Sequence, residues 1–275
     1  MAIKNILVAY SGSESSKAAV ELGRRMMRKY GAHLTGALTF APSEIATTLK
    51  PYASADLTSV IQKAESDRRA AIKAEFMTLL KDADPENVHW VESGGDVDYN
   101  LMELARTYDI VLVGQYDGTR ENRNLVPHPD MIALNSGRPV LVVPPVLPST
   151  VLNDRAVLAW DGGKSAARAL ADAMDILESK SEISIVSVGE GSAEVLDRLS
   201  KVSAHLKRHG IVSEPEIVPR TQRSIGKVLL EVAERHEAGI LIMGAYEHSK
   251  FFEDIFGGAT HSAIATAKVP VLMSH

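Results

Sequence analysis

Two glycine-containing runs in the second half of the sequence have the residue types of an anion-binding site. An Asp-Gly-Gly run at 161–163 directly follows an apolar stretch, and a Gly-Gly-Ala-Thr run at 257–260 precedes an apolar pattern with helical spacing. Backbone N–H groups at the start of a helix lack partners, and glycine has no Cβ to block a close approach. A phosphate group therefore suits the glycine pair, and the Asp161 carboxylate could accept hydrogen bonds from sugar hydroxyls.

Further candidates follow the predicted strands of the same half. Val188 ends the second strand, Gly244 ends the fourth, and His248 lies in the loop after Gly244. Ligands of open parallel sheets bind beyond the carboxyl ends of the strands. The candidate ligand-binding residues are therefore Asp161, Gly162, Val188, Gly244, His248, Gly257, Gly258, Ala259 and Thr260. A solvated loop position is the alternative for His248, and a helix-capping role is the alternative for Thr260.

The elements that must position these residues occur twice in the chain. The run LVAYSGS at 7–13 matches VLAWDGG at 157–163, a constant offset of 150 residues. The runs at 110–114 and 138–142 likewise resemble those at 240–244 and 269–273. The chain is therefore an internal duplication, and we predict its two domains at 1–147 and 153–275, separated by a proline-rich linker.

Each half alternates strand-like and helix-like segments. In the first half we expect strands at 5–10, 33–40, 88–92, 110–114 and 139–143, and helices at 14–30, 56–82, 97–108 and 129–136. In the second half we expect strands at 156–161, 182–188, 213–218, 240–244 and 270–273, and helices at 164–178, 192–209, 224–236 and 259–267. Apolar runs without alternation are typical of parallel strands buried on both faces. The predicted fold class is α/β, with two tandem five-stranded parallel sheets packed together.

Composition narrows the classes of partner and chemistry. The 275 residues carry 30 Lys and Arg against 35 Asp and Glu, and this net charge of −5 argues against nucleic acid as a partner. The absence of cysteine excludes disulfides, thiolate zinc sites and thiol nucleophiles. No segment approaches 18 apolar residues, so we expect a soluble, cytoplasmic protein without a membrane partner.

Histidines are the remaining metal-ligand candidates. His205 and His209 have helical i, i+4 spacing, but the basic residues between them favour a solvated helix face. The histidines at 248, 261 and 275 lack this spacing, and we expect the terminal His275 to be mobile. The sequence therefore predicts no metal site.

Four features of the second half are informative together: the strand-ending Asp161-Gly162, the Met243-Gly244 turn, the Gly257-Gly258 helix entry and the closing run VPVL at 269–272. At these residues the sequence resembles the universal stress protein family in its tandem, two-domain bacterial form. The resemblance covers nearly the whole chain. It implies a Rossmann-like, adenine nucleotide alpha hydrolase-like fold in each half, with the halves paired through their last strands. In the ATP-binding branch it also implies a nucleotide held by the aspartate and by a loop of the form Gly-x-x-Gly, nine residues, Gly-Ser/Thr.

Both halves depart from that loop. In the second half, Glu247 stands in place of the second glycine, which adds backbone strain and charge repulsion. Gly258 stands in place of the Ser/Thr and removes its hydroxyl, which Thr260 could replace. In the first half, Ser11 replaces the aspartate, and a Pro-His-Pro run at 127–129 replaces the paired glycines. Proline brings no N–H donor, so we predict that the first half has a degenerate ligand site and serves as a structural partner.

Three classes of function follow. The leading interpretation is a stress-response protein whose second half binds a small molecule, an adenine nucleotide such as ATP with magnesium. The alternative is an interaction scaffold in stress adaptation that works without nucleotide, which Glu247 and Gly258 favour. An enzyme is the least favoured class, because no nucleophile, base or metal set converges on the loop, although weak ATPase activity stays open. We expect the two halves to pair within one chain, and a homodimer is left open.

Overall fold

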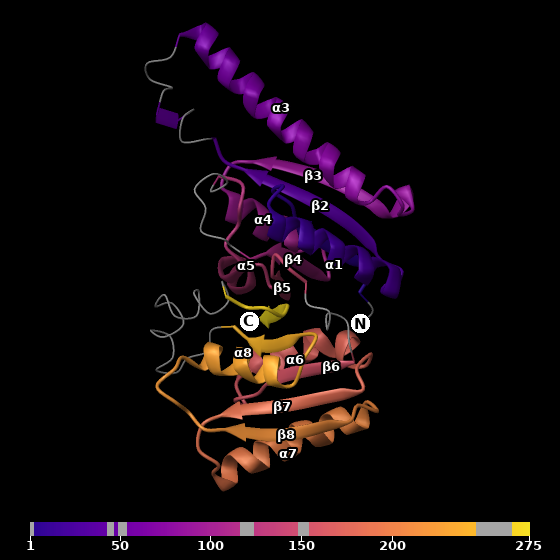
Figure 1. The fold of residues 1–275 in the computed structure, drawn as a ribbon, viewed down its shortest axis with the longest axis vertical. Helices are drawn as coiled ribbons and strands as arrows, with labels where there is room; N and C mark the ends of the chain where they lie inside the picture. The colour runs from indigo at the N-terminus through magenta and orange to yellow at the C-terminus, as the bar shows by residue number, and fades with distance from the viewer. Residues whose placement is uncertain (1–2, 43–46, 49–53, 116–123, 148–153, 246–265) are drawn as a thin grey trace.

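A computed structural model describes residues 3–42, 47–48, 54–115, 124–147, 154–245 and 266–275. The N-terminal half contains β1 (Asn5–Ala9), α1 (Glu14–Tyr30), β2 (His33–Phe40), α3 (Ala55–Leu79), the short 3-10 helix η1 (Pro85–Asn87), β3 (Val88–Gly94), α4 (Val97–Ala105), β4 (Ile110–Gly114), α5 (Pro129–Asn135) and β5 (Val140–Val143). The C-terminal half contains β6 (Arg155–Ala159), α6 (Lys164–Leu177), β7 (Glu182–Val188), α7 (Ala193–Arg208), β8 (Ser213–Val218), α8 (Ile225–Arg235), β9 (Leu241–Gly244) and β10 (Val271–Ser274). Figure 1 shows the two halves placed end to end.

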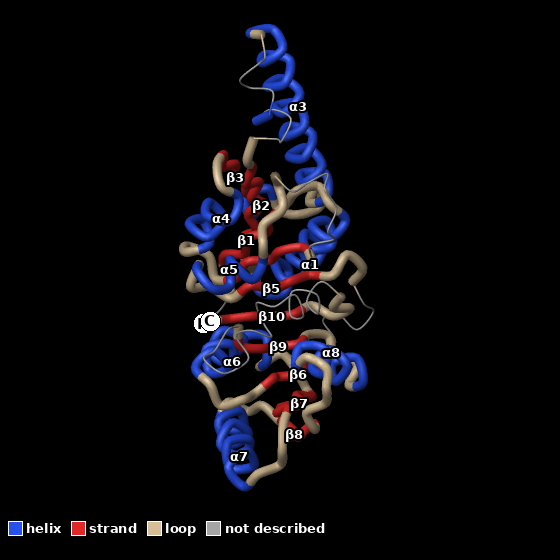
Figure 2. Tube along the Cα trace, turned by 90° about the vertical axis from the view of Figure 1, so that its left-hand side faces the viewer, coloured by secondary structure: helices blue, strands red, loops and turns tan. Residues whose placement is uncertain are grey.

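The described strands form one continuous sheet in the order β3-β2-β1-β4-β5-β10-β9-β6-β7-β8. Figure 2 shows these strands following one another along the long axis of the molecule. Strands within each half run parallel, and the halves meet where β5 and β10 pair antiparallel, with Leu141 opposite Leu272. The α/β fold class is confirmed, and so is the prediction that the last strand of each half pairs with that of the other.

Helices cover both faces of the sheet. One core cluster joins the sheet to α1, α3, α6 and α7, and the other joins it to α4, α5 and α8. Strand β1, in the middle of the N-terminal half, shows this coverage, because Ile6, Leu7 and Val8 are all fully buried although they point to alternate faces. None of the described helices is long and apolar enough to cross a membrane. The helix expected at 259–267 falls mostly outside the described residues.

Local sequence signals explain where α1 begins and ends. The Ser13 side chain accepts a hydrogen bond from the backbone N–H of Ser16, which caps the first turn. Gly31 ends the helix with a left-handed backbone, at a φ of 57°, and its N–H bonds to the carbonyl of Met27. The Ser13 cap places the start of α1 shortly after β1, at the carboxyl edge of the N-terminal half, and the Gly31 cap ends the helix before β2.

Helix α3 is the element that most breaks the symmetry of the duplication. Its 25 residues rise past β3 at one end of the molecule (Figures 1 and 2). Of the whole helix, only Ile72 and Phe76 are buried. The helix is therefore attached to the sheet through its C-terminal third, and Phe76 packs against Tyr10 and Trp90.

Side chains also join the two halves across the β5–β10 junction. Gln115 Nε2 donates to the Ala267 carbonyl at 3.2 Å, and Lys29 Nζ donates to Ser179 Oγ at 2.6 Å. Lys180 lines a small pocket between α1 and α6. Burial lowers the pKa of Lys180 to about 8. The two halves therefore share polar contacts as well as a strand pair.

Candidate functional site

The carboxyl ends of β9, β6 and β7 lie side by side, because these strands are parallel neighbours in the sheet. The structure therefore brings four of the candidate residues to one edge of the C-terminal half: Asp161, Gly162, Val188 and Gly244. The other five, His248, Gly257, Gly258, Ala259 and Thr260, lie outside the described residues. Whether the glycine pair meets Asp161 stays a prediction.

The loop after β6 presents an exposed carboxylate beside the start of α6. Gly162 has a φ of 83°, a left-handed backbone that favours glycine. The turn lets the Gly163 N–H donate to Asp161 Oδ1 at 2.8 Å, which holds the carboxylate near the helix start. Gly163 is the N-cap of α6 and has no side chain to bond the first-turn N–H groups. This end of α6 thus keeps the partial positive charge that attracts anions.

Gly244 is required by packing. A Cβ built on Gly244 would lie 2.6 Å from both the Ala166 nitrogen and the Ser165 carbonyl carbon. Gly114 repeats this arrangement in the N-terminal half, where its Cβ would lie 2.6 Å from the carbonyl carbon of Ser15. Since both copies need the glycine for close packing of a helix start, its presence in the sequence is explained without a ligand.

Arg198 of α7 is a site residue that the sequence did not reveal. Its Nη1 donates to the Asp161 carbonyl at 3.2 Å, and its stem covers Gly162, whose built Cβ would lie 3.0 Å from Arg198 Cδ. The guanidinium also pairs with Glu194, one helical turn away. In the sequence this i, i+4 pair is typical of a solvated helix face, so only the fold places the cation beside Asp161.

His275 also lies at this edge. Its Nδ1 is 2.8 Å from the Ala245 carbonyl oxygen and 3.3 Å from Ser165 Oγ. Strand β10 thus brings His275 to one hydrogen-bond partner directly after β9 and one on α6, and the expectation that it is mobile stays a prediction. Among the described residues, no group of three or more His, Cys, Asp or Glu could hold a metal ion.

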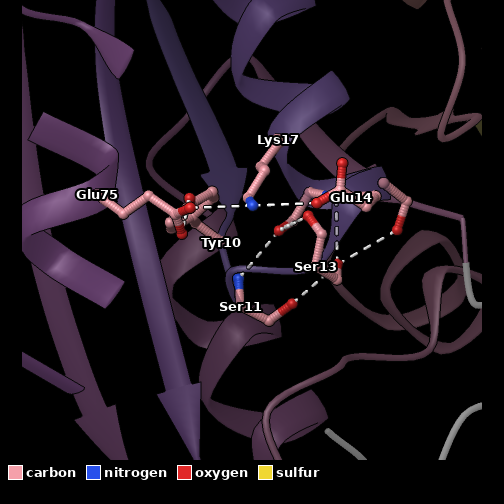
Figure 3. Close-up of polar contacts among 8 residues, drawn as sticks. Tyr10, Ser11, Ser13, Glu14, Lys17 and Glu75 are labelled. Atoms are coloured by element: carbon pink, nitrogen blue, oxygen red, sulfur yellow. Dashed lines mark hydrogen bonds and ion pairs between the residues drawn. The ribbon is translucent and has the colours of Figure 1, made fainter. Parts of the chain in front are cut away.

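The residue that covers the corresponding turn of the N-terminal half has the opposite charge. Glu75, from α3, covers the turn after β1, and a Cβ built on Gly12 would lie 3.5 Å from Glu75 Oε2. Figure 3 shows Glu75 held by two donors, the Tyr10 hydroxyl at 2.7 Å and Lys17 Nζ at 2.9 Å. Lys17 also pairs with Glu14 at 3.0 Å.

The Glu75 carboxyl is held in its charged form. Burial opposes its ionisation, but hydrogen bonds from Tyr10 and Lys17 outweigh burial and lower the pKa of Glu75. The Ser13 side chain caps α1 as well, so the anion-attracting end of this helix already has an acceptor. In the first half, a carboxylate thus covers the turn after β1, and the start of α1 is already capped.

His128 stands where the paired glycines of a nucleotide loop would lie, and it is tied to α4. Its backbone N–H donates to Asp98 Oδ1 at 2.7 Å, and its Nδ1 donates to Asp98 Oδ2 at 2.8 Å. The hydrogen bond to Asp98 raises the pKa of His128 above its ordinary value. The residue therefore joins α5 to α4.

The Asp98 contact makes part of the stability pH-dependent. Because the pKa of His128 is raised in the folded state, the stabilisation is complete below its unfolded value of about 6.5 and is lost as pH rises through the folded pKa. The ring is half-exposed, so we expect a contribution under about 1 kcal/mol. Urea unfolding of the wild type and His128→Gln should differ more at pH 5.5 than at pH 8.5. A difference that does not change with pH would contradict this assignment.

Comparison with known proteins gives the family. The sequence model of the universal stress protein family matches residues 2–144, which is just over half of the chain. The chain belongs to the universal stress protein family. No curated protein matches it.

Solved structures of related proteins extend over both halves. A universal stress protein from Archaeoglobus fulgidus DSM 4304 is 20% identical, with a TM-score of 0.73 over 98% of this chain and 95% of that one. A putative universal stress protein from Pseudomonas aeruginosa UCBPP-PA14 is 12% identical, with a TM-score of 0.60 over 99% and 93%. At these identities the likeness shows the fold, so the universal stress protein architecture spans the duplicated chain.

Proposed function

We propose that this universal stress protein is a cytoplasmic stress-response protein whose C-terminal half binds an adenine nucleotide, ATP with magnesium, at the carboxyl edge of β6, β7 and β9. The observation that carries the proposal is the reversal of charge between the two copies. Glu75 covers the turn after β1, whereas Arg198 covers the equivalent turn after β6. The first helical residue is reversed as well, with Glu14 in α1 and Lys164 in α6.

Each part of a nucleotide has a suitable group at this edge. The open N-terminus of α6 and the Arg198 guanidinium offer donors and positive charge to phosphate oxygens. The exposed Asp161 carboxylate can accept hydrogen bonds from the ribose hydroxyls. Half-buried Val188, at the end of β7, offers apolar surface to a base. The N-terminal half is proposed to complete the fold without binding nucleotide.

Calorimetric titration of the full chain with ATP and magnesium tests the proposal. We expect saturable binding with one nucleotide per chain, and we expect Asp161→Ala to weaken it about tenfold to a hundredfold. Hydrogen bonds to charged groups contribute about 1.5–3 kcal/mol, and the loss of that free energy raises the dissociation constant by about this factor. Arg198→Gln should weaken binding of ATP more than binding of adenosine, because in the proposed site the guanidinium contacts the phosphates, which adenosine lacks.

The duplication and α7 offer matched controls. Ser11→Ala changes the position equivalent to Asp161 and should leave the affinity unchanged. Lys201→Gln removes a cation with the same i, i+4 pairing on the same helix, to Asp197, and should also have no effect. Equal losses in Asp161→Ala and Ser11→Ala, or a flat titration of the wild type, would refute the site.

The second candidate function is a nucleotide-independent interaction scaffold. The replacement of two loop positions by Glu247 and Gly258 favours it, because both changes weaken phosphate binding. A flat titration, together with freshly purified protein that releases no nucleotide on denaturation, would support the scaffold. We propose no catalytic activity, and sustained release of ADP from bound ATP would overturn that part.

A further inference from the structure

Two histidines of the N-terminal half face each other on neighbouring strands. His33 opens β2 and His89 is the second residue of β3, and both side chains are exposed. The Nδ1 atom of His33 lies 3.0 Å from the Nε2 atom of His89. The two rings are nearly parallel, at 19°, with their centroids 5.3 Å apart. These two nitrogens therefore face each other at hydrogen-bond distance.

The strand register holds the pair in place. Thr35 is directly opposite His89, and side chains two residues apart on a strand share a face, so His33 and His89 lie on one face as diagonal neighbours. Ala37, on the same face of β2, packs in the core cluster that contains Leu101 of α4. The strand that carries His33 is thus packed in the core four residues further along.

The duplication shows that the fold does not require histidine at these places. Asn5 is opposite His33 in β1 and β2, just as Arg155 is opposite Glu182 in β6 and β7. Arg155 and Glu182 form an ion pair at 2.9 Å. The residue equivalent to His33 is therefore Glu182, and because Thr35 and Ser184 are equivalent, the residue equivalent to His89 is Glu214.

We propose that His33 and His89 together bind one transition-metal ion of the imidazole-preferring class, Cu²⁺, Ni²⁺ or Zn²⁺, through His33 Nδ1 and His89 Nε2. Metal–nitrogen distances of about 2.0–2.1 Å place two nitrogens of a tetrahedral site about 3.3 Å apart. The pair needs to open by only a few tenths of an ångström to reach that spacing. Both side chains are exposed, so this movement meets little packing resistance.

The proton that the two rings share does not prevent metal binding. In a neutral pair, one ring donates its N–H to the other, and the metal needs both of these nitrogens free. The donor ring can move its proton to its other nitrogen, which leaves both facing nitrogens free for the metal without loss of a proton from the pair.

Water would complete the coordination, because the described residues around the pair add no third His, Cys, Asp or Glu. The ion would therefore exchange with solvent and keep open positions, unlike a closed structural zinc site. Affinity should follow the order in which Cu²⁺ exceeds both Ni²⁺ and Zn²⁺, and Mg²⁺ should not bind, since it prefers oxygen ligands.

The test uses full-length, tag-free protein freed of metal by a chelator, titrated with Cu²⁺, Ni²⁺, Zn²⁺ and Mg²⁺. The background is the His205→Gln/His209→Gln double variant, which removes the second close histidine pair, with ring centroids 4.9 Å apart. We expect one Cu²⁺ site in this background, whose electron paramagnetic resonance spectrum shows coupling to two imidazole nitrogens. Adding His33→Gln or His89→Gln should weaken that site about tenfold or more and leave at most one coupled nitrogen.

Each outcome decides the proposal. Loss of the same site in both single variants, with an unchanged unfolding midpoint in the absence of metal, supports it. Copper binding that persists with two coupled nitrogens after either substitution overturns it, because other residues would then hold the ion. Binding that disappears with the His205→Gln/His209→Gln change alone overturns it as well.

Discussion

Replacing Phe76 by alanine is expected to lower the free energy of unfolding by about 3–5 kcal/mol, the usual cost of deleting a buried aromatic ring. The side chain has an exposed fraction of 0%. Its ring lies 5.5 Å from that of Tyr10 and 5.1 Å from that of Trp90, measured between centroids. Because Ile72 is the other buried residue of α3, the substitution would remove much of the attachment of this helix.

Urea unfolding measures this effect, with Val60→Ala as the matched control on the same helix. Val60 is 64% exposed, so its loss should change stability by less than about 0.5 kcal/mol. Phe76→Ala should also release the neighbouring Glu75 from Tyr10. If Phe76→Ala costs no more than Val60→Ala, α3 is not anchored through this ring.

Gly244→Ala is expected to lower the free energy of unfolding by about 3 kcal/mol, at the upper end of the cost of overpacking. The added methyl group would lie 2.6 Å from backbone atoms of Ser165 and Ala166. Backbone atoms at a helix start cannot rotate away as a flexible side chain can, so α6 or β9 must shift. That shift would also move the Asp161 turn, and nucleotide affinity should fall with stability.

Two further glycines separate packing from ligand binding. Gly114→Ala places the same methyl group 2.6 Å from Ser15 in the N-terminal half, so it should cost similar stability and leave nucleotide affinity unchanged. Gly191→Ala is the neutral control, because its built Cβ would meet only Ile217 Cδ1, at an ordinary 3.7 Å. Denaturant midpoints and ATP titrations of the three variants check this pattern. A neutral Gly244→Ala would show that α6 does not pack tightly against β9.

Most strands and helices could be predicted from the sequence, because their signals are local. The expected strands at 33–40, 110–114 and 182–188 and the expected helix at 14–30 have the observed bounds. The domain boundaries and the ligand roles of the nine candidate residues stay predictions. Sequence reasoning missed the two residues that cover the turns after β1 and β6, which are Glu75 and Arg198.

The sequence could not reveal these two residues because their partners lie far away along the chain. Glu75 meets Tyr10 across 65 positions, and Arg198 meets Asp161 across 37. Each lies on a helix whose charged pattern is typical of a solvated face, so periodicity predicts a surface and gives no partner. The same reason hid the His33–His89 pair, which is separated by 56 positions and joined only by strand register.

Local patterns are enough to predict that this chain is duplicated and that each copy alternates buried parallel strands with helices. They also predict that a serine follows the first strand of one copy and an aspartate that of the other. Periodicity, caps and turn residues carry this information because each depends on neighbours within a few positions. The tertiary structure alone decided that a carboxylate covers one turn and a guanidinium the other. The crossing of distant helices over the sheet sets these contacts, and no local pattern encodes that crossing.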